Sequence, residues 1–402
     1  MRKFLSCFFL IVILIFILTT FSNAFVDNSF IWSGDYVIET STSSDVDLQF
    51  ESASAILIEQ NSGKILYEHN SHEQLRPASV TKVMSILLIM EALDSGKISL
   101  DDKVPCSEQA ANMGGSQIWL DVREELTVNE MLKAICVASA NDCTVAMAEY
   151  LAGSQEAFVE KMNIRAKELG MNDTCFKNCH GLDTDGHVTS SYDISLMSRE
   201  LLKNHPSITN YTTIWMDTLR DGKSELVNTN KLIRNYKGAT GLKTGSTDLA
   251  LYNLSASATR DNLSLIAVIM KSPSTKIRFS EAQKLLDYGF SNYSYVSFAK
   301  KDTILKNINI SKGVNPFVNL VYECDSGALL KKGAENEIEQ IVNIYDNIKA
   351  PISKGQKLGE INYLLNGENI GNTALVSDIE IKKITLSNMY EHILFDWFYL
   401  LR

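Results

Sequence analysis

The apolar segment from Val80 to Leu93 constrains the fold more than any other part of the sequence. It is too long for a β-strand, whose usual length is about five or six residues, so we expect it to form a helix. A helix that is apolar on all sides has to be buried on all sides. The segment therefore predicts a core helix inside a globular domain.

The sequence around this segment predicts one sheet covered by helices. Helical periodicity fills the middle of the region, whereas strand-like runs lie at both of its ends. We therefore expect an α/β (α+β) domain at 51–292. The predicted elements are a hairpin at 54–58 and 65–67, helices at 80–93, at 126–151 with a break at 139–142, and at 155–170, strands at 241–247, 250–259 and 263–271, and a helix at 279–288.

Residues 293–380 show a different pattern, with short alternating runs at 304–310, 317–322, 338–344 and 361–365 that are separated by Gly, Asn, Asp and Lys. This pattern is typical of a small all-β domain. A chain of 402 residues has room for two domains of about 100–200 residues each. Its composition, 45% hydrophobic and 21% charged, is that of a globular protein.

The N-terminus has the three-part layout of a signal peptide. A basic start is followed by an almost unbroken apolar run at 4–20 and by small residues up to Ala24. We expect cleavage after Ala24, which assigns 1–24 to the signal peptide and 25–50 to a polar linker. The alternative is an uncleaved anchor, because the run is close to the roughly 17–25 residues that a membrane span needs. Both interpretations predict export.

The C-terminal segment 381–402 predicts an amphipathic helix. Its apolar side chains fall on one helical face and its polar side chains lie largely opposite. Such a helix after a β domain is typical of an anchor in the plane of a membrane surface. A helix packed on the protein itself is the alternative, because the polar face is not especially basic. The apolar face consists of Leu386, Met389, Tyr390, Ile393, Leu394, Trp397, Phe398 and Leu401.

The charge of the chain argues against nucleic-acid binding. The formal net charge is -10 and the sequence has no basic stripe, whereas phosphate binding needs clustered Lys and Arg. Cys136 and Cys143 lie in an apolar helical pattern and are expected to be buried thiols. Cys175 and Cys179, with His180 beside them, match no common zinc spacing, so we expect no metal site.

The first motif that carries chemistry is Ser79-Val80-Thr81-Lys82, at the start of the core helix. Residues three apart on a helix lie on one face. A serine hydroxyl becomes a nucleophile when a neighbouring base removes its proton. A lysine can be that base where burial or nearby positive charge lowers its pKa well below about 10.4. Taken alone, S-x-x-K also occurs by chance in ordinary helices.

Two further motifs follow along the chain. Ser139-Ala140-Asn141 lies at the expected break between helices, where polar side chains are presented rather than buried. Lys243-Thr244-Gly245 lies in an expected strand, where a glycine lets a substrate backbone come close. The order S-x-x-K, S-x-N and K-T-G, at intervals of about sixty and about one hundred residues, is the signature of penicillin-recognising serine enzymes.

With these motifs the chain resembles the low-molecular-mass penicillin-binding proteins of the serine-type D-alanyl-D-alanine carboxypeptidase family, peptidase family S11. The resemblance extends from about residue 50 to the C-terminus, because that family also has a β-rich second domain and an amphipathic C-terminal anchor. The stretches that carry it further are Ala55-Ile56-Leu57-Ile58, Ser62-Gly63-Lys64, Leu75 to Ser79, Ala138 to Asp142, Leu169-Gly170-Met171, Gly181-Leu182 after His180, and Leu285 to Phe290.

The resemblance implies a catalytic role for four residues. Ser79 would form the acyl-enzyme, and Lys82 would be the base that activates it. Ser139 would pass protons toward the leaving D-alanine, and Asn141 would orient Lys82 and the substrate amide.

It also implies substrate-binding residues on and near the K-T-G strand. Lys243 would shape the electrostatics of the site, and Thr244 would help to hold the terminal carboxylate of the substrate. Backbone N–H groups of Ser79 and Ser246 would form the oxyanion hole, and Arg278 would contact the carboxylate through the network around the strand. Some relatives have a histidine where this chain has Ser246, which leaves substrate preference open. The substrate-binding set is Lys243, Thr244, Gly245, Ser246 and Arg278.

The reaction that the resemblance implies removes the terminal D-alanine from peptidoglycan stem pentapeptides through an acyl-enzyme, without a cofactor. β-Lactams would acylate the same serine, and the resulting acyl-enzyme would be hydrolysed slowly. The enzyme would act at the extracytoplasmic face of the cell membrane, held there by the C-terminal helix.

Three alternatives stay open. A class A β-lactamase shares S-x-x-K and K-T-G but carries a glutamate in E-x-x-L-N, and the stretch 160–163 lacks that form. A zinc D,D-peptidase would show a pattern such as H-E-x-x-H, which His180 and His187 do not provide. A wall protein that binds penicillin without turnover is the non-enzyme alternative, and the intact motifs argue against it.

Overall fold

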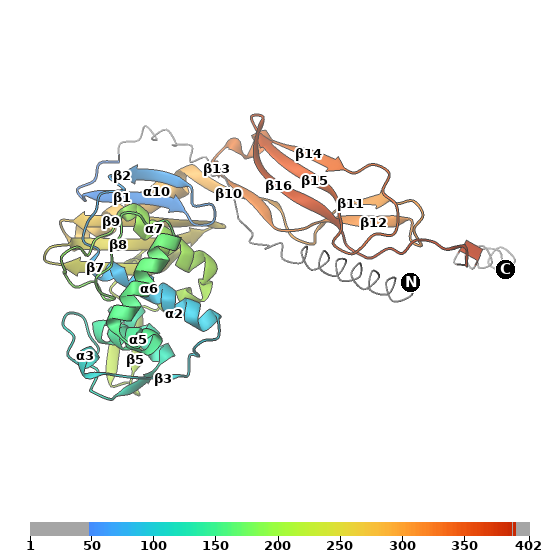
Figure 1. Ribbon diagram of the computed structural model, residues 1–402. Helices are drawn as coiled ribbons and strands as arrows, with labels where there is room; N and C mark the ends of the chain where they lie inside the picture. The colour runs from blue at the N-terminus through green and yellow to red at the C-terminus, as the bar shows by residue number, and fades with distance from the viewer. Residues whose placement is uncertain (1–47, 388, 391–402) are drawn as a thin grey trace, which may run out of the picture. The chain divides into compact units, whose positions relative to one another are not determined.

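The computed structural model describes residues 48–387 and 389–390 (Figure 1). The predicted signal peptide, the linker up to residue 47 and residues 391–402 of the predicted C-terminal helix lie outside the described residues. Within the described part of the chain, no helix is both long and apolar enough to cross a membrane.

A five-stranded antiparallel sheet forms the centre of the first domain, with strand order β2-β1-β9-β8-β7. The hairpin from the start of the domain pairs with the last of the three later strands, as Ala55 opposite Ile269 illustrates. The α/β fold predicted from helices flanked by strands is therefore confirmed. The strands are β1 (Ser54–Glu59), β2 (Ile65–His69), β7 (Ala239–Thr247), β8 (Leu251–Arg260) and β9 (Leu263–Ser272).

Alternate residues of the central strands are buried on opposite faces of this sheet. Leu265 and Ala267 of β9 belong to the cluster that contains the buried face of α10, whereas Ile266 and Val268 belong to the larger cluster with α2, α5 and α7. This period of two is the geometry of a strand covered on both sides. Figure 1 shows α2, α5, α6 and α7 gathered beside one face. The helices are α2 (Lys82–Asp94), α5 (Asn141–Ala152), α6 (Gln155–Glu168), α7 (Ser191–Asn204) and α10 (Thr275–Asn292).

The predicted core helix is α2, and nine of its 13 residues are buried. The stretch from Lys82 to Leu87 is buried on all sides, as expected for an apolar helix. The C-terminal end is partly exposed, with Glu91 paired with Arg165 and Asp94 at the surface.

The first turn of α2 differs from the prediction. Residues Ala78–Thr81 form a 3-10 turn, η1, and the α-helix begins at Lys82. Side chains three apart eclipse each other on a 3-10 turn, so Ser79 and Lys82 still lie on one side.

The predicted break at 139–142 is a change of helix type. The helix α4 (Val128–Lys133) continues as a π-helical turn, η2 (Ala134–Ala138), and α5 then begins at Asn141. Between them Ser139 has the left-handed conformation, with φ 62°. Left-handed residues and π-turns are both uncommon and both are frequent at functional sites.

The second domain is all-β, as predicted for 293–380. Its main sheet has the order β11-β12-β16-β15-β14, and β10 pairs with β13. Asn366 and Gly367, both with positive φ, form the tight turn between β15 and β16, as two-residue hairpins require. The prediction missed β10, β13 and β16. The strands are β10 (Tyr293–Ala299), β11 (Ile304–Asn309), β12 (Phe317–Tyr322), β13 (Ser326–Lys331), β14 (Ile338–Ile344), β15 (Lys357–Leu365) and β16 (Glu368–Ser377).

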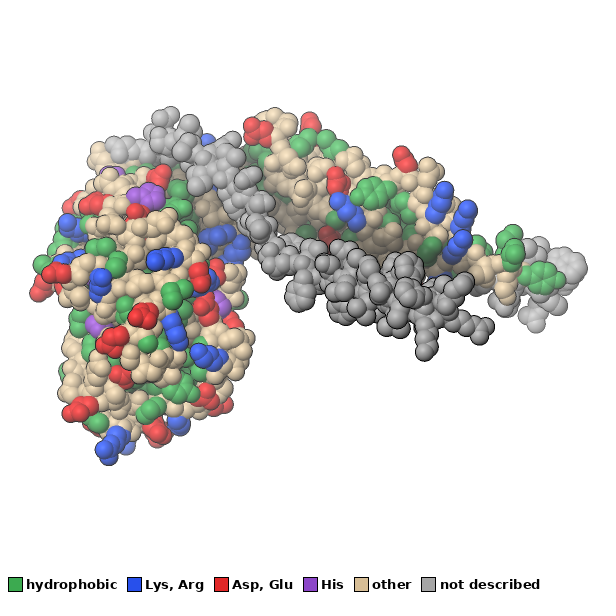
Figure 2. Space-filling view, in the orientation of Figure 1, with side chains coloured by type: hydrophobic (Ala, Val, Ile, Leu, Met, Phe, Trp, Pro, Cys, Tyr) green, Lys and Arg blue, Asp and Glu red, His purple; other side chains and the backbone are tan. Residues whose placement is uncertain are grey.

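Charged side chains of both signs are mixed on the surface around α2, α5, α6 and α7 (Figure 2). No continuous basic stripe is visible on this face. The mixture agrees with an acidic chain of net charge -10, since a nucleic-acid surface gathers Lys and Arg on one face.

The packing of α2 generates the first prediction. Leu87 is 0% exposed, so Leu87→Ala should lower the free energy of unfolding by about 3 kcal/mol, the usual cost of a buried leucine-sized cavity. Urea unfolding followed by circular dichroism measures it. Leu100, 42% exposed, is the matched control, and Leu100→Ala should cost less than about 1 kcal/mol. Equal losses in both variants would contradict the buried position of α2.

Candidate active site

Two glycines let the chain pack tightly around the turn that carries Ser79. A Cβ atom on Gly181 would lie 1.9 Å from the carbonyl oxygen of Ala78, and Gly181 has φ +94°. A Cβ atom on Gly245 would lie 2.8 Å from the backbone nitrogens of both Ser79 and Val80. Only glycine permits these approaches. The loop after His180 and the K-T-G strand β7 therefore lie directly against the backbone of Ser79.

Lys82, the first residue of α2, is buried beside this turn and is 0% exposed. Its Nζ atom lies 3.1 Å from Ser79 Oγ, 2.6 Å from Asn141 Oδ1 and 2.7 Å from the carbonyl oxygen of His180. No carboxylate is among these hydrogen-bond partners. Burial, followed by the nearby Lys243, holds the pKa of Lys82 well below its usual range. The structure thus brings together three of the four predicted catalytic residues.

Ser139 faces a second buried lysine. Lys243 Nζ donates to Ser139 Oγ at 2.9 Å and to the carbonyl oxygen of Thr244 at 2.9 Å. Burial lowers the pKa of Lys243 to about 7. The left-handed backbone of Ser139 aims its hydroxyl at β7. Two lysine and serine pairs therefore lie side by side, Ser79 with Lys82 and Ser139 with Lys243.

The carboxylate of Asp142 holds the loop in front of α5. Asp142 is 0% exposed and accepts the backbone N–H groups of Ile118 and Leu120, each at 3.1 Å. The preceding residue, Asn141, donates to the carbonyl oxygen of Gly114 at 2.6 Å. Adjacent residues thus serve different purposes, since Asn141 contacts Lys82 and Asp142 anchors the loop. The sequence prediction gave Asp142 no role, although it directly follows the S-x-N motif.

The predicted substrate-binding residues line β7 and the helix behind it. Thr244 Oγ1 donates to Thr229 Oγ1 at 2.7 Å, and Ser246 is exposed. Arg278, at the start of α10, donates from Nη1 to the carbonyl oxygens of Gly245 (3.1 Å) and Asn253 (3.0 Å). Its Nε atom is buried without a partner, and burial lowers its pKa to about 10. In the described structure Arg278 thus reaches the K-T-G strand through backbone oxygens.

His187, to which the sequence prediction gave no role, is hydrogen-bonded to the turn that carries Ser79. The Lys177 N–H donates to His187 Nδ1 at 2.8 Å, so the neutral ring carries its proton on Nε2, 2.8 Å from Thr81 Oγ1. Thr81 donates in turn to the carbonyl oxygen of Ala78 at 2.8 Å. Burial lowers the pKa of His187 to about 4. No sequence motif marks His187, because its role depends on the fold of the loop at 175–190.

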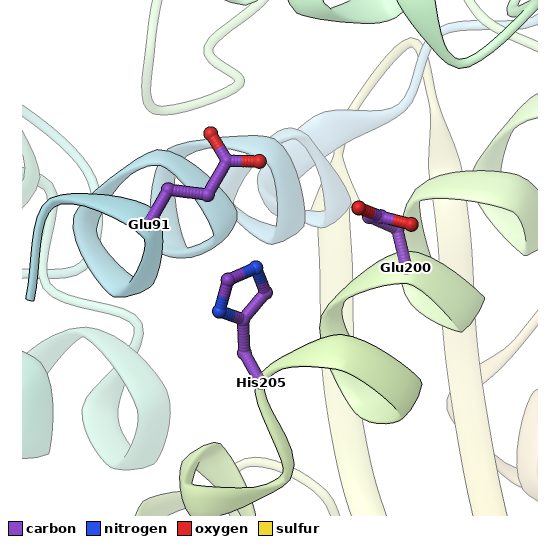
Figure 3. Close-up of side chains that lie close together, drawn as sticks. All are labelled: Glu91, Glu200 and His205. Carbon is purple, nitrogen blue, oxygen red and sulfur yellow. The ribbon is translucent and has the colours of Figure 1, made fainter. Parts of the chain in front are cut away.

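Among the described residues, one group places metal-ligating atoms within 4.8 Å of one another: Glu91, Glu200 and His205 (Figure 3). Arg165 bonds to both carboxylates, through Nε to Glu91 and Nη2 to Glu200, each at 2.7 Å. His205 Nδ1 lies 2.5 Å from Asp94 Oδ2. The two glutamates are therefore already paired with a cation, and we interpret the group as an ion-pair cluster. Cys175, Cys179 and His180 form no such group in this part of the chain.

The fold and the site define a class of enzyme. β7 is an edge strand, so its free edge can accept an extended peptide beside Ser79. A buried lysine with no acidic partner lies within hydrogen-bond distance of the serine hydroxyl. This is the arrangement of a serine acyl-transfer enzyme of the penicillin-recognising class.

Comparison with known proteins identifies the family. Residues 39–274 match the family model for D-alanyl-D-alanine carboxypeptidase, and residues 293–383 match that for the C-terminal domain of penicillin-binding protein 5. The D-alanyl-D-alanine carboxypeptidase DacF of Bacillus subtilis is 45% identical over 355 residues, which are 87% of this chain and 91% of that protein. DacC of Escherichia coli is 33% identical over 80% of this chain and 82% of its own length.

Solved structures agree. Penicillin-binding protein 5 from Haemophilus influenzae has a TM-score of 0.69 at 30% identity and covers 85% of this chain and 100% of its own. Penicillin-binding protein D2 from Listeria monocytogenes, solved in an ampicillin-bound form, has a TM-score of 0.56 at 30% identity, over 61% of this chain and 100% of its own. The chain belongs to the D-alanyl-D-alanine carboxypeptidase family. It is a serine-type D-Ala-D-Ala carboxypeptidase, as the sequence motifs predicted.

The buried His187 generates a prediction on acid stability. Its pKa falls from 6.5 in the unfolded chain to about 4 in the folded protein, so between these values the unfolded state binds more protons and stability falls as the pH falls. At 1.36 kcal/mol for each pKa unit, the loss should reach about 3 kcal/mol.

His187→Gln keeps an acceptor for Lys177 and a donor for Thr81 but does not titrate. Unfolding measured from pH 7.5 to pH 4 should show a flatter loss of stability in this variant than in the wild type. His180, whose pKa burial lowers to about 3, is present in both proteins, and because His187 is the smallest cause of that shift, after burial and Lys82, its contribution should change little. Parallel pH profiles would contradict a neutral, buried His187.

Proposed function

We propose that Ser79 is the nucleophile of the carboxypeptidase and that Lys82 is its base. The hydrogen-bond partners of Lys82 support this assignment most directly. A neutral lysine amine has two N–H donors and one lone pair. The carbonyl oxygens of Asn141 and His180, at 2.6 and 2.7 Å, take the two donors. The lone pair then faces the Ser79 hydroxyl at 3.1 Å, where it can accept the proton of that hydroxyl.

The proposed reaction has two steps. In the first, Ser79 Oγ loses its proton to Lys82 and bonds to the carbonyl carbon of the penultimate D-alanine. The C–N bond to the terminal D-alanine breaks, and the proton held by Lys82 passes through Ser139 to the leaving amine, which leaves Lys82 neutral again. In the second, a water molecule attacks the ester and gives a proton to Lys82. The ester bond then breaks, and Lys82 returns the proton to Ser79 Oγ, which regenerates the serine. Backbone N–H groups of Ser79 and Ser246 would stabilise the oxyanion in both steps.

We propose that the substrates are peptidoglycan stem peptides that end in D-Ala-D-Ala. An extended peptide beside β7 would place its terminal carboxylate near Thr244 and Lys243, and Arg278 would add positive charge behind the strand. Lys243 is protonated below its pKa of about 7 and would then attract the carboxylate. The ampicillin-bound form of the Listeria relative supports β-lactams as covalent inhibitors that acylate Ser79.

Release of D-alanine from a peptide ending in D-Ala-D-Ala tests the proposal. Ser79→Ala should lose at least about a thousandfold of kcat, because the nucleophile is absent, and should no longer be labelled by fluorescent penicillin. Ser297, an exposed serine of β10, provides the control, and Ser297→Ala should match the wild type in both assays.

Other outcomes would support the alternatives. Penicillin turnover at a rate of several per second would favour a β-lactamase. Stable penicillin labelling without D-alanine release would indicate a binder without turnover. Loss of activity in EDTA, with full activity in Ser79→Ala, would favour a metal-dependent peptidase.

We also propose that the protein is exported and held at the extracytoplasmic face of the membrane by its C-terminal helix. Residues 381–384 still belong to the β domain, since Ile381 is 2% exposed and pairs with Ile352. Beyond them the apolar side chains of the predicted anchor face solvent. Leu386 is 88% exposed, Met389 50% and Tyr390 66%. Such a row of exposed apolar residues supports insertion of one helical face into a membrane surface.

Vesicle flotation tests the anchor. The mature protein should float with liposomes that contain anionic lipid, and a variant that ends at Thr385 should remain at the bottom of the gradient with its carboxypeptidase activity intact. Equal flotation of the two proteins would refute this role of the helix. A protein whose thermal stability drops on truncation would instead indicate that the helix packs on the protein.

A further inference from the structure

We propose that Trp119 is a specificity-determining residue of the carboxypeptidase. It would bind the long aliphatic side chain of the stem-peptide residue that precedes D-Ala-D-Ala. The inference rests on the proposed reaction at Ser79. It extends that proposal to the recognition of the substrate residue on the N-terminal side of D-Ala-D-Ala.

Trp119 differs from its neighbours in exposure. Ile118 and Leu120 are 6% and 3% exposed, whereas Trp119 is 74% exposed. A single exposed apolar side chain is ordinary on a protein surface. Here, however, buried neighbours on both sides hold a large aromatic residue out in solvent.

The backbone of Trp119 is also in an unfavourable conformation. Its φ is +60°, in the left-handed region that a large side chain rarely adopts. Such strain persists where the surroundings impose it, and strained residues cluster at functional sites. A glycine would relieve the strain and would remove the indole, so the sequence retains the aromatic side chain at a cost in conformational energy.

Two charged side chains impose this conformation. The buried carboxylate of Asp142 accepts the N–H groups of Ile118 and Leu120, on either side of Trp119. Arg220 donates to the carbonyl oxygens of Ile118 (2.8 Å) and Trp119 (3.1 Å). Glu124 fixes Arg220 in turn, with bonds of 2.6 and 2.8 Å to its guanidinium. The indole is thus presented from a backbone that hydrogen bonds hold from both sides.

The same hydrogen bonds place Trp119 near the catalytic lysine. Asp142 anchors the backbone around Trp119, and Asn141, its neighbour, contacts Lys82 Nζ. Asn141 also contacts the loop of Trp119 directly, since its N–H donates to the carbonyl oxygen of Ser116 at 2.7 Å and its side chain donates to that of Gly114 at 2.6 Å. A long side chain on the residue before D-Ala-D-Ala ends about 11 Å from the scissile carbonyl, so it can extend along this loop toward Trp119.

The chemistry of the indole fits an aliphatic partner. A flat aromatic face buries a methylene chain from water without requiring a hydrogen bond. Tryptophan is enriched among residues that dominate binding energy, and a rigid side chain loses little conformational entropy on contact. A lysine-like third residue would bring four methylene groups to this face.

Three synthetic substrates test the proposal: N-acetyl-D-Ala-D-Ala, N-acetyl-L-Ala-D-Ala-D-Ala and diacetyl-L-Lys-D-Ala-D-Ala. In Trp119→Ala, kcat/KM should fall about tenfold on the lysine substrate, within the range for loss of apolar contacts in a specificity pocket. It should change less than twofold on the other two substrates. Trp119→Phe should recover most of the loss, because it keeps an aromatic face. Tyr345, 51% exposed on the β domain, is the control, and Tyr345→Ala should match the wild type throughout.

Trp119→Gly separates binding from structure. It should show the same substrate-selective loss as Trp119→Ala, with a Tm equal to or above that of the wild type, because the strain is removed. An equal loss on all three substrates would assign Trp119 a structural role in the loop and overturn the proposal. No loss on any of the three substrates would also overturn it. If the wild type released no D-alanine from any substrate, the proposed reaction itself would be wrong.

Discussion

The structure depends above all on the burial of Lys82 without a negative charge to pair with it. Taking a lysine out of water disfavours its charged form, so burial holds the pKa of Lys82 well below its usual range. The two carbonyl oxygens that receive its N–H groups satisfy the amine but do not neutralise a cation as a carboxylate would. The apolar helix α2, the sheet and the covering helices exclude water from this position. The apolar composition of α2 therefore determines the surroundings of Lys82 as well as the packing of the core.

Most of the surrounding architecture can be understood as a means of bringing backbone close to this lysine. Gly181 and Gly245 let a loop and a strand approach the turn of Ser79 more closely than any other residue would allow. The π-helical turn before Ser139 changes the direction of the chain, so that Ser139 points at β7 and the next helix presents Asn141 to Lys82. Each of these features is locally unfavourable, and the two buried clusters on either side of the sheet supply the stability that maintains them.

The sequence predicted the elements with strong periodicity and the residues that form motifs. The core helix, the hairpin, the three later strands and the break at 139–142 all appear in the structure, because burial on one or two faces imposes a period that is visible in the residues. β16 and β13 were missed because glycine and polar residues dilute their alternation. The supporting residues Asp142, His187 and Arg220 were not predicted, since their roles come from contacts between segments far apart in the chain. The 3-10 turn at Ser79 depends on the same long-range packing.

The position of Asn141 and Asp142 as neighbours on one helical turn has a consequence for how such an enzyme can diverge. The first contacts the amine of Lys82 and the second holds the loop that carries Trp119. A rotation or shift of this turn would move both contacts together, so the surroundings of Lys82 and the backbone that presents Trp119 are mechanically linked. Exchange of the exposed side chain at position 119 would leave these hydrogen bonds in place, whereas a change in the path of the loop would disturb the contacts of Lys82. The fold thus places a side chain that can vary freely on a backbone that cannot.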